Sequence, residues 1–378
     1  MPSQAVRRQS DSSLMTKLLE KALHLLVEWL LRKRSTALLM IQAGLVCLSL
    51  AFAAGFAFNL SMPIAGGQID LKYDGGDGTP QVLVYCTGFL GLLLTVVGAG
   101  WAGIKGFAEY QSQAKRKVIA VEVRGLRNVS GVPLVESIPK AIPGKREQLL
   151  IDVRQYIRDG EITDPAAALS IITSLPEDLR RRQAGLDRSD ITYVYGGLAP
   201  VPLTFLTGIL VDDEGQFLVL DWDRHSEKWR TLSDPDDHKR FVISGLEKSF
   251  SYMAEVALVV SVSYGIDHKD VQSRVGRMPI VDLSLEKGNT ETHWSDAKTQ
   301  ALGRQFLEVL GELNRRGVKR IHLFLAAPNS VVFRFGRLYD RRNLPQLVVY
   351  YFERGRSPPY RWGILMPVSG IAEPKVLY

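Results

Sequence analysis

The segments Ile191–Arg224, ITYVYGGLAPVPLTFLTGILVDDEGQFLVLDWDR, and Ile321–Arg354, IHLFLAAPNSVVFRFGRLYDRRNLPQLVVYYFER, are two copies of one pattern. They align without a gap at an offset of 130 residues, from Ile191 to Ile321. Each has an apolar strand, a turn of small residues, a helix start with proline and a second apolar strand. The paired turns are Gly196-Gly197 and Ala326-Ala327, and both segments end in an acid followed by arginine. The pattern predicts a diverged duplication.

The repeat continues upstream of both segments. Val118–Leu126 (VIAVEVRGL) resembles Leu258–Ile266 (LVVSVSYGI), and VPLVE from Val132 resembles MPIVD from Met278. The offsets differ from one element to the next, which indicates that the connecting loops changed length, as surface loops tolerate.

The order of strands and helices predicts the fold class. Helical patterns over Pro165–Gln183 and Trp294–Arg316 lie between the strands of the two copies. Alternating strands and helices favour α/β halves with mostly parallel, buried strands. We therefore predict a domain over residues 115–378 with two Rossmann-like halves, at about 115–235 and 250–367.

The candidate ligand-binding residues are those at the ends of the predicted strands. Open α/β sheets bind ligands at the carboxyl ends of strands, near helix N-termini whose N–H groups favour phosphates. The candidates are Arg124, Gly125, Gly196, Gly197, Ser263, Tyr264, Gly265, Ala326, Pro328, Asn329 and Ser330. Asp223, Arg224, Trp229 and Arg354 are weaker candidates. Asn329 and Ser330 are also residue types that cap helices, so a structural role for them stays open.

Two uncharged apolar runs near the N-terminus predict a membrane anchor. They cover Ser35–Leu60 and Gln81–Ile104, and a helix needs about 20 residues to cross a bilayer. We predict a two-helix module over residues 35–104, with spans at about 36–59 and 82–104. The length of the runs disfavours buried core helices, and the long polar segment before the first run disfavours a cleaved signal peptide.

The segment before the anchor, residues 1–34, contains an amphipathic pattern over Leu14–Leu31. Such a helix suits the membrane interface or a contact with the soluble domain, and the sequence leaves both readings open.

Charges on either side of the spans predict the orientation. Arg32, Lys33 and Arg34 precede the first span, and Lys105, Lys115, Arg116 and Lys117 follow the second span, whereas the loop between the spans carries Asp70, Asp74 and Asp77 against one lysine. Positive flanks stay in the cytoplasm, so we predict that both termini are cytoplasmic.

Small residues recur at four-residue spacing in both spans. Ser49, Ala53 and Ala57 share this spacing in the first span, and Ala99 and Gly103 in the second. The spacing lets helices approach closely, although alanine and glycine are also common in membrane helices in general. Neither span contains an ionisable residue, which disfavours a standing ion path or proton relay.

Composition and motifs predict no catalytic residue, no metal site and no cofactor. The net charge of +7 suits an acidic membrane surface or a polyanionic ligand without choosing between them. Cys47 and Cys86 both lie in the apolar runs, so the soluble part has no thiol nucleophile. The common phosphate-loop, dinucleotide, serine-hydrolase and zinc-protease motifs are absent. The acidic cluster Asp234–His238 is better explained as a solvated turn than as a metal site.

The segment HLFLAAPNS with the following glycine-containing helix and VVYYFE strand resembles the C-terminal half of a SAVED domain, and YVYGGLAPVPLTFLTGILVDDEGQFLVLDWDR is similar to its N-terminal half. The resemblance covers about residues 117–367. It implies two fused CARF-like halves that bind a cyclic oligonucleotide made by a cognate nucleotidyltransferase. It further implies an effector of CBASS anti-phage systems, whose attached module here is the two-span anchor.

From this resemblance we expect a binding protein and not an enzyme, located as a multi-pass protein in the bacterial inner membrane. The expected ligand is a cyclic trinucleotide, because the two halves present unlike turns. The expected consequences are ligand-induced homo-oligomers, contact with membrane lipid, membrane disruption and abortive infection, without DNA binding. The alternatives are a membrane-anchored hydrolase or ring nuclease that acts on the same ligand, and a receptor that only recruits a partner.

Overall fold

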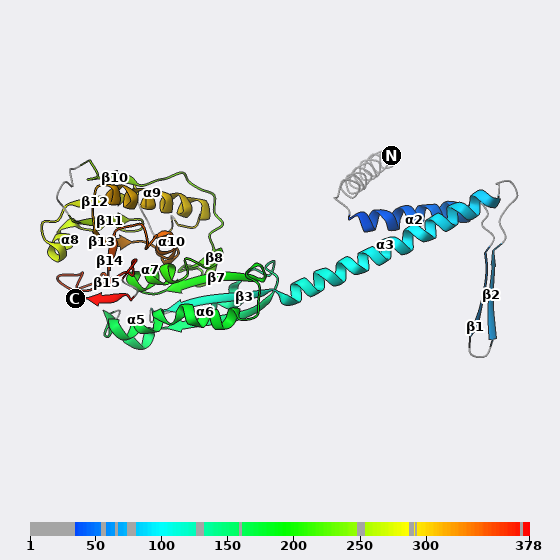
Figure 1. Ribbon diagram of the computed structural model, residues 1–378, viewed down its shortest axis with the longest axis horizontal. Helices are drawn as coiled ribbons and strands as arrows, with labels where there is room; N and C mark the ends of the chain where they lie inside the picture. Colours follow the sequence, from blue (N-terminus) through cyan, green and yellow to red (C-terminus); the bar gives the residue numbers. More distant parts are fainter. Residues whose placement is uncertain are drawn as a thin grey trace, which may run out of the picture. The chain divides into compact units, whose positions relative to one another are not determined.

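In the computed structural model the chain divides into two compact units, Met1–Ser112 and Gln113–Tyr378. The residues described are 35–53, 58–64, 67–73, 81–125, 132–158, 161–247, 254–286, 291, 293–370 and 373–378. The predicted amphipathic helix at Leu14–Leu31 lies outside these residues. Figure 1 shows the elements of both units.

The first unit contains helices α2 (Thr36–Ala53) and α3 (Gln81–Lys115) and a hairpin between them. Strands β1 (Phe58–Ile64) and β2 (Gly67–Tyr73) of this hairpin pair antiparallel. Helix α2 is shorter than the span predicted at 36–59, whose last residues lie in β1. Its 18 residues give a length of about 27 Å, close to the thickness of a bilayer core.

Of the helices that the structure describes, α3 contains the longest apolar segment. Val82–Ala108 is long and apolar enough to cross a membrane, whereas Thr36–Phe52 is a shorter apolar helix. Many large apolar side chains of both helices are exposed, among them Leu50 and Phe89. Exposed apolar faces of this extent are typical of helices that contact lipid.

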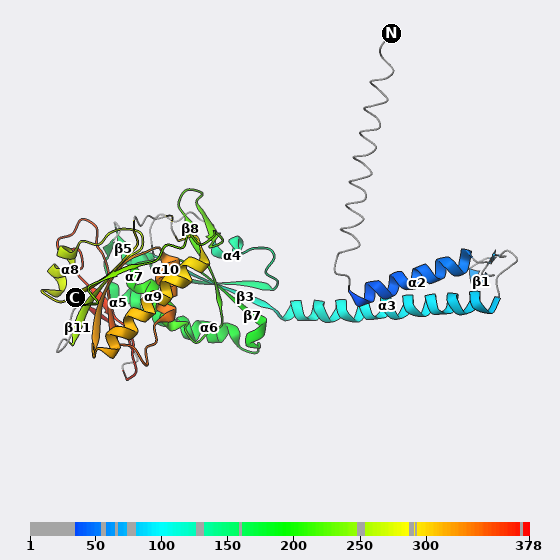
Figure 2. The same ribbon diagram turned by 90° about the horizontal axis from the view of Figure 1, so that it is seen from above.

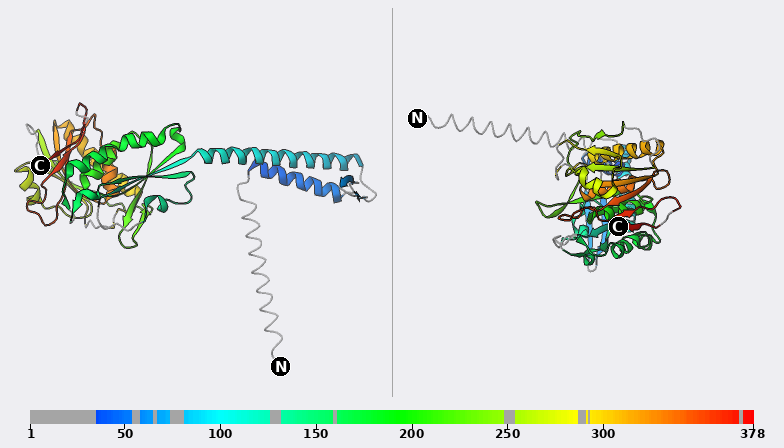
Figure 3. Two further views of the ribbon diagram at one scale, coloured as in Figure 1. Left: turned by 90° about the horizontal axis from the view of Figure 1, so that it is seen from below. Right: turned by 90° about the vertical axis from the view of Figure 1, so that its left-hand side faces the viewer.

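Helix α2 runs along α3 through a seam of small residues, and the two helices lie side by side in Figure 3. A Cβ atom at Gly44 would lie 2.3 Å from Thr95 Oγ1, and one at Gly91 would lie 2.8 Å from the Gly44 carbonyl oxygen. Ala37 and Ala51, seven residues on either side of Gly44, are buried as well. Seven-residue spacing keeps one helix face against its partner.

The small residues singled out in the sequence lie outside this seam. Ser49, Ala99 and Gly103 are exposed, and nothing lies within 4 Å of a Cβ atom placed on Gly103. The contact within the pair therefore uses a different face from the predicted one. Ala57 lies outside the described residues, and so does the side chain of Ala53.

In the described part of the second unit, two mixed sheets form the framework (Figure 2). The strands of the first sheet, in spatial order, are β4 (Lys145–Asp152), β3 (Lys117–Arg124), β7 (Ile191–Leu198), β8 (Phe217–Asp223) and β9 (Lys228–Thr231). Those of the second are β10 (Val242–Ser244), β12 (Ile280–Ser284), β11 (Glu255–Ser261), β13 (Arg320–Ala326), β14 (Gln346–Tyr350), β15 (Gly363–Leu365) and β16 (Lys375–Leu377).

Helices and short elements connect these strands. The helices are α4 (Leu134–Ser137), α5 (Pro165–Thr173), α6 (Leu175–Gln183), α7 (Val201–Leu210), α8 (His268–Val275), α9 (Asp296–Arg315) and α10 (Asn329–Leu338). The short elements are η1 (Arg154–Tyr156), β5 (Ile157–Arg158), β6 (Glu161–Ile162) and η2 (Arg188–Asp190). Local caps explain two helix starts: Asp164 accepts a hydrogen bond from the Ala167 amide before α5, and Ser295 from the Lys298 amide before α9.

The two halves have the same topology. The order β4-β3-β7-β8 matches β12-β11-β13-β14, and all neighbours within each set are parallel. Helix α7 follows β7 as α10 follows β13. The predicted fold class, two fused Rossmann-like halves, is confirmed.

One element of the predicted repeat is wrong. The VPLVE segment does not form the counterpart of β12, because Leu134–Ser137 is helix α4. The counterpart is β4, which begins with the charged and polar residues KREQ. As an edge strand of the sheet, β4 has no need for the continuous apolar run by which the other strands were recognised.

The halves are joined where α7 crosses α10. A Cβ atom at Gly208 of α7 would lie 2.3 Å from the Phe333 carbonyl oxygen, and one at Gly336 of α10 would lie 2.1 Å from the Phe205 carbonyl oxygen. Each helix also packs on strands of the other half: α7 on β14 and β15, and α10 on β7 and β8. One apolar core therefore runs through both halves.

We predict that Gly336→Ala destabilises the second unit by about 3 kcal/mol or more, because the added methyl group meets backbone atoms that cannot move independently. Gly311→Ala on α9 is the matched control, since its nearest neighbour is the flexible end of Arg315 at 3.9 Å. Alanine is the better helix former by about 0.5–1 kcal/mol, so this control should be slightly stabilised. Urea unfolding followed by circular dichroism measures both, and equal effects of the two changes would contradict the crossing.

Candidate ligand-binding site

A hollow of about 100 Å³ lies at the carboxyl ends of the strands of both halves. Its lining residues come from the ends of β7 and β8, the turns after β11 and β13, and the loop before α9. They are Leu198, Asp221, Trp222, Arg224, Ser263, Tyr264, Glu291, His293, Trp294, Ala327, Pro328 and Asn329. This is the edge at which α/β sheets bind ligands.

The first turn of α10 is tied to the opposite half. The side-chain oxygen of Asn329 accepts hydrogen bonds from the Ala199 amide at 3.1 Å and from the Thr204 hydroxyl at 2.8 Å. The Ser330 amide donates to Asp221 Oδ2 at 3.0 Å. Neither Asn329 nor Ser330 caps its own helix, because the N-cap position is taken by Pro328. These bonds hold the wall of the hollow in place.

Asp221 is the centre of this polar wall. Its carboxylate accepts the Trp222 amide at 2.8 Å and lies 3.4 Å from His293 Nε2, and both side chains are about 5% exposed. Burial, together with the charge of Asp221, raises the pKa of the Tyr195 phenol above its ordinary value. Tyr195, which is buried in β7, therefore stays neutral.

Five predicted residues line the hollow: Arg224, Ser263, Tyr264, Pro328 and Asn329. Ala326 is the last residue of β13, and Ser330 is buried beside Asp221. Gly265 follows Tyr264, and a Cβ atom there would meet nothing within 4 Å.

Gly196 and Gly197 do not form a turn. They are buried inside β7, and a Cβ atom at Gly196 would lie 2.7 Å from Leu134 and 2.9 Å from Trp229. The turn comes two residues later, at Ala199-Pro200. Their small size is required for packing, so the prediction that they contact a ligand has no support from their position.

Arg124 and Gly125 are held by the first half itself. Arg124 Nε donates to Glu122 at 2.5 Å, and this fully buried carboxylate also accepts the Leu134 amide and the Gln148 side chain. A Cβ atom at Gly125 would lie 2.9 Å from Pro200. These contacts give both residues a structural role.

The remaining weak candidates, Asp223, Trp229 and Arg354, do not line the hollow. Arg354 is exposed after β14, and Trp229 is buried with its indole N–H bonded to the Val132 carbonyl. Asp223 accepts the His225 and Ser226 amides, and these hydrogen bonds lower the pKa of the carboxyl. Asp223 therefore shapes a turn.

Sequence reasoning missed the most buried residues of the wall, Asp221 and His293, and the neighbouring Trp294. The signal for Asp221 was present, since an acid within the apolar strand FLVLDWD requires a buried partner. His293 and Trp294 lie in a loop with no repeat counterpart, so only the folded chain brings them here.

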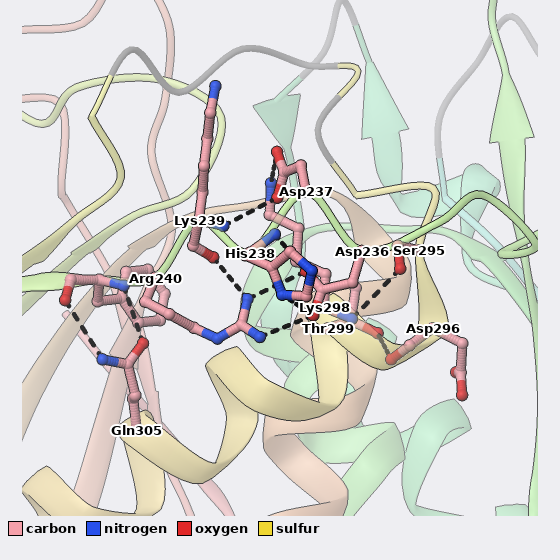
Figure 4. A network of polar contacts seen from close by, with 11 residues as sticks. Asp236, Asp237, His238, Lys239, Arg240, Ser295, Asp296, Lys298, Thr299 and Gln305 are labelled. Carbon is pink, nitrogen blue, oxygen red and sulfur yellow. Dashed lines mark hydrogen bonds and ion pairs between the residues drawn. The ribbon is translucent and has the colours of Figure 1, made fainter.

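The chain that links the halves holds this loop in position. Figure 4 shows Asp237 bonded to Lys298 at 2.8 Å and Asp236 bonded to Arg240 at 2.7 Å. The Asp234 amide also donates to the Trp294 carbonyl at 2.9 Å. The acidic segment is thus an anchored turn, and the described residues contain no cluster suited to a metal ion.

We predict that Asp237→Asn lowers the free energy of unfolding at neutral pH, because Lys298, only 1% exposed, loses its carboxylate partner. The expected loss is about 2 kcal/mol. It is smaller than the roughly 3–5 kcal/mol of a fully buried pair, because Asp237 is 39% exposed. The double variant Asp237→Asn/Lys298→Met removes both charges. Measured by chemical unfolding, it should recover most of the free energy of unfolding that Asp237→Asn loses.

The pH dependence follows from the pKa of Asp237. Burial raises this pKa, but hydrogen bonds from Lys298 and the Lys239 amide lower it below its ordinary value of 3.8. A depressed carboxyl pKa adds stability above that ordinary value and loses it as the pH falls through the folded pKa. The difference between wild type and Asp237→Asn should therefore vanish in strong acid, and a constant difference would refute the pair.

Comparison with known families identifies the chain. Residues 175–366, just over half of its length, match the family described as the SMODS-associated and fused to various effectors sensor domain, SAVED. The chain belongs to the SAVED family. Residues 16–169 match the SAVED-fused 2TM effector domain. The predicted architecture, a SAVED sensor joined to a module of two transmembrane helices, is confirmed.

Solved structures of low sequence identity also match. The Acinetobacter baumannii Cap4 SAVED/CARF-domain containing receptor with the cyclic trinucleotide 2′3′3′-cAAA is 12% identical, with a TM-score of 0.45 over 76% of this chain and 59% of that one. The Moraxella osloensis Cap4 receptor is 11% identical, with a TM-score of 0.45 over 76% and 57%. The SAVED chain described here thus spans less than two thirds of either receptor. No curated protein sequence matches it.

Proposed function

We propose that this SAVED protein is a membrane effector of anti-phage defence that is switched by a cyclic oligonucleotide from a cognate nucleotidyltransferase. The observation that carries the proposal is the hollow that both halves build together at their strand ends. Family membership supplies the sensor role, and the fused two-helix module supplies the output.

The lining suits a nucleotide. Bases stack on aromatic rings, and guanidinium groups pair with phosphates; Tyr264 is 62% exposed at the rim, and Arg224 is exposed beside it in the lining. Glu291 accepts the Trp294 indole N–H at 2.8 Å and offers a carboxylate to a base amino group. The hollow of about 100 Å³ is smaller than typical ligand pockets, so it would seat one nucleotide while the rest of the ring lies across its mouth.

The two sides of the hollow are unlike. One half presents Leu198 and Arg224, and the other presents Pro328, Asn329 and Tyr264. An asymmetric site favours an odd-numbered ring over a ring with twofold symmetry. We therefore propose a cyclic trinucleotide as the ligand.

We predict that, in calorimetry against cyclic di-, tri- and tetranucleotides, a cyclic trinucleotide binds the protein most tightly. Tyr264→Ala and Arg224→Ala should each weaken binding about tenfold or more, the scale of one lost stacking or phosphate contact. Arg354→Ala, an exposed arginine outside the hollow, is the matched control and should bind as wild type. Equal losses in all three variants would show that the hollow does not select the ligand.

The membrane step requires several copies. One pair of spans without ionisable residues encloses no water path, whereas Ser49, Ala99 and Gly103 remain exposed on the described helices and allow neighbouring pairs to pack. Ligand binding would stabilise the assembled state, since an effector acts only through its differential affinity for two states. We propose that assembly disrupts the bacterial inner membrane, with both termini in the cytoplasm, and causes abortive infection.

We predict that the cyclic trinucleotide converts the protein to larger oligomers and releases dye from proteoliposomes. Ser49→Leu combined with Gly103→Leu should leave ligand affinity within about twofold but reduce leakage at least tenfold, because bulky residues block close packing. The control, Leu50→Ala on the exposed apolar face, should leak normally. Tight binding with neither assembly nor leakage would favour a receptor that only recruits a partner.

A second candidate function, opening of the bound ring, is favoured by one observation. His293 lines the hollow with Asp221 at 3.4 Å, and an imidazole oriented by a carboxylate is a common general base. It would take the proton of a ribose hydroxyl that attacks the adjacent phosphorus. The bond from that phosphorus to the oxygen of the next ribose would break, and the protonated imidazole would return the proton to this leaving oxygen. Chromatography of the ligand after incubation separates the two functions: linear product that is lost in His293→Ala would make the protein an enzyme, and intact ligand would leave it a sensor.

A further inference from the structure

A second hollow, of about 380 Å³, lies between α9, α10 and the start of β8 and shares no lining residue with the first. Its lining comprises Gln216, Phe217, Asp296, Gln300, Arg304, Arg334, Arg337 and Leu338. Residues three or four apart share a helix face. Accordingly, α9 contributes one stripe of residues at positions 296, 300 and 304, and α10 contributes another at 334 and 337.

Close packing of the two helices brings these stripes together. A Cβ atom at Gly303 of α9 would lie 2.5 Å from the Leu338 side chain of α10. The guanidinium carbon of Arg337 lies over the ring of Phe217, 4.8 Å from its centroid. Nη2 of the same arginine donates hydrogen bonds to the carbonyl oxygens of Glu214 and Gly215, both at 3.0 Å. The guanidinium of Arg337 is thereby held in place against the ring of Phe217, which also lines the hollow.

The lining has more positive than negative charge. Of its ionisable side chains three are arginines, and the one carboxylate, Asp296, is bonded to Arg334 and to Gln300. Arg304 is exposed and has no ion pair with any residue that the structure describes. Nε of Arg334 and Nε of Arg337 are buried without a hydrogen-bond partner. Each guanidinium has five N–H donors, so much of their capacity is unused.

Arg334 and Arg337 lie close enough for their positive charges to repel each other. Burial, and then the neighbouring charge of Arg334, lowers the pKa of Arg337, while Asp212 and Glu214 offset part of that effect. An anion among the three guanidinium groups would relieve this repulsion, because charge-assisted bonds from arginine to phosphate are among the strongest polar contacts in proteins.

We infer that this second hollow is a binding site for a phosphate group with two negative charges, distinct from the cyclic oligonucleotide site. Arg304 of α9 would bind the phosphate from one side of the hollow. Arg334 and Arg337 of α10 would bind it from the other side. The volume leaves room for an organic group attached to the phosphate. Because the site lies on helix α10, whose first turn forms the wall of the first hollow, its occupation would stiffen the helix that both sites share.

The test uses the full chain in nanodiscs of neutral lipid, titrated with pyrophosphate by calorimetry at constant ionic strength. Arg304→Glu should weaken binding at least tenfold. Arg180→Glu, an exposed arginine on α6 that does not line the hollow, is the matched control and should bind as wild type. Arg224→Ala, in the first hollow, should also leave pyrophosphate affinity unchanged.

Three results would overturn the inference: no measurable binding, equal affinity in wild type and Arg304→Glu, or loss of binding in Arg224→Ala alone. Repeating the titration in nanodiscs with phosphatidic acid distinguishes the source of the phosphate. Unchanged affinity points to a soluble phosphate, and competition abolished by Arg304→Glu points to a lipid headgroup. Neither arm depends on a cyclic oligonucleotide, so failure of the proposed ligand would leave this test intact.

Discussion

The crossing of α7 and α10 is the contact on which the rest of the sensor depends. Two glycines, Gly208 and Gly336, let each backbone reach a carbonyl oxygen of the other helix, with no room for a Cβ atom at either position. Because each helix follows a central strand of its own half and packs on the other sheet, the crossing sets the distance between the two sheets. It also brings the two strand edges together as one site.

The α7–α10 crossing also positions the hydrogen bonds that hold the site rigid. Asn329 reaches Ala199 and Thr204 across the boundary, and the Ser330 amide reaches Asp221. A buried polar network of this kind is favourable only when its members are satisfied together. The Arg224 and Tyr264 side chains line the same hollow and are exposed, so they remain available to a ligand.

The repeat in the sequence predicted the duplicated fold because buried parallel strands require continuous apolar runs, as in Val256–Val262. It could not predict β4, a polar edge strand, nor the hairpin β1–β2 between the membrane helices. The repeat predicted a turn at Gly196-Gly197, because small residues occur both in turns and where packing is tight. Only the folded positions of Leu134 and Trp229, which leave no room for a Cβ atom at Gly196, show that packing is the reason here. For the site, residues that directly follow strands were predictable, whereas His293 and Trp294 are brought in by a loop whose path is set by tertiary contacts.

In the membrane module, the four-residue spacing of small residues predicted a contact through Ser49. The contact between α2 and α3 instead follows the seven-residue spacing of Ala37, Gly44 and Ala51.

If both halves seat one ligand at their shared strand edge, a crystal structure of residues 113–378 with a bound cyclic trinucleotide will show it there. We expect electron density for one nucleotide in the hollow, with Tyr264 and Arg224 in contact with the ring and the α7–α10 crossing unchanged. An empty hollow with the ligand bound elsewhere, or a ligand that touches residues of one half alone, would contradict it.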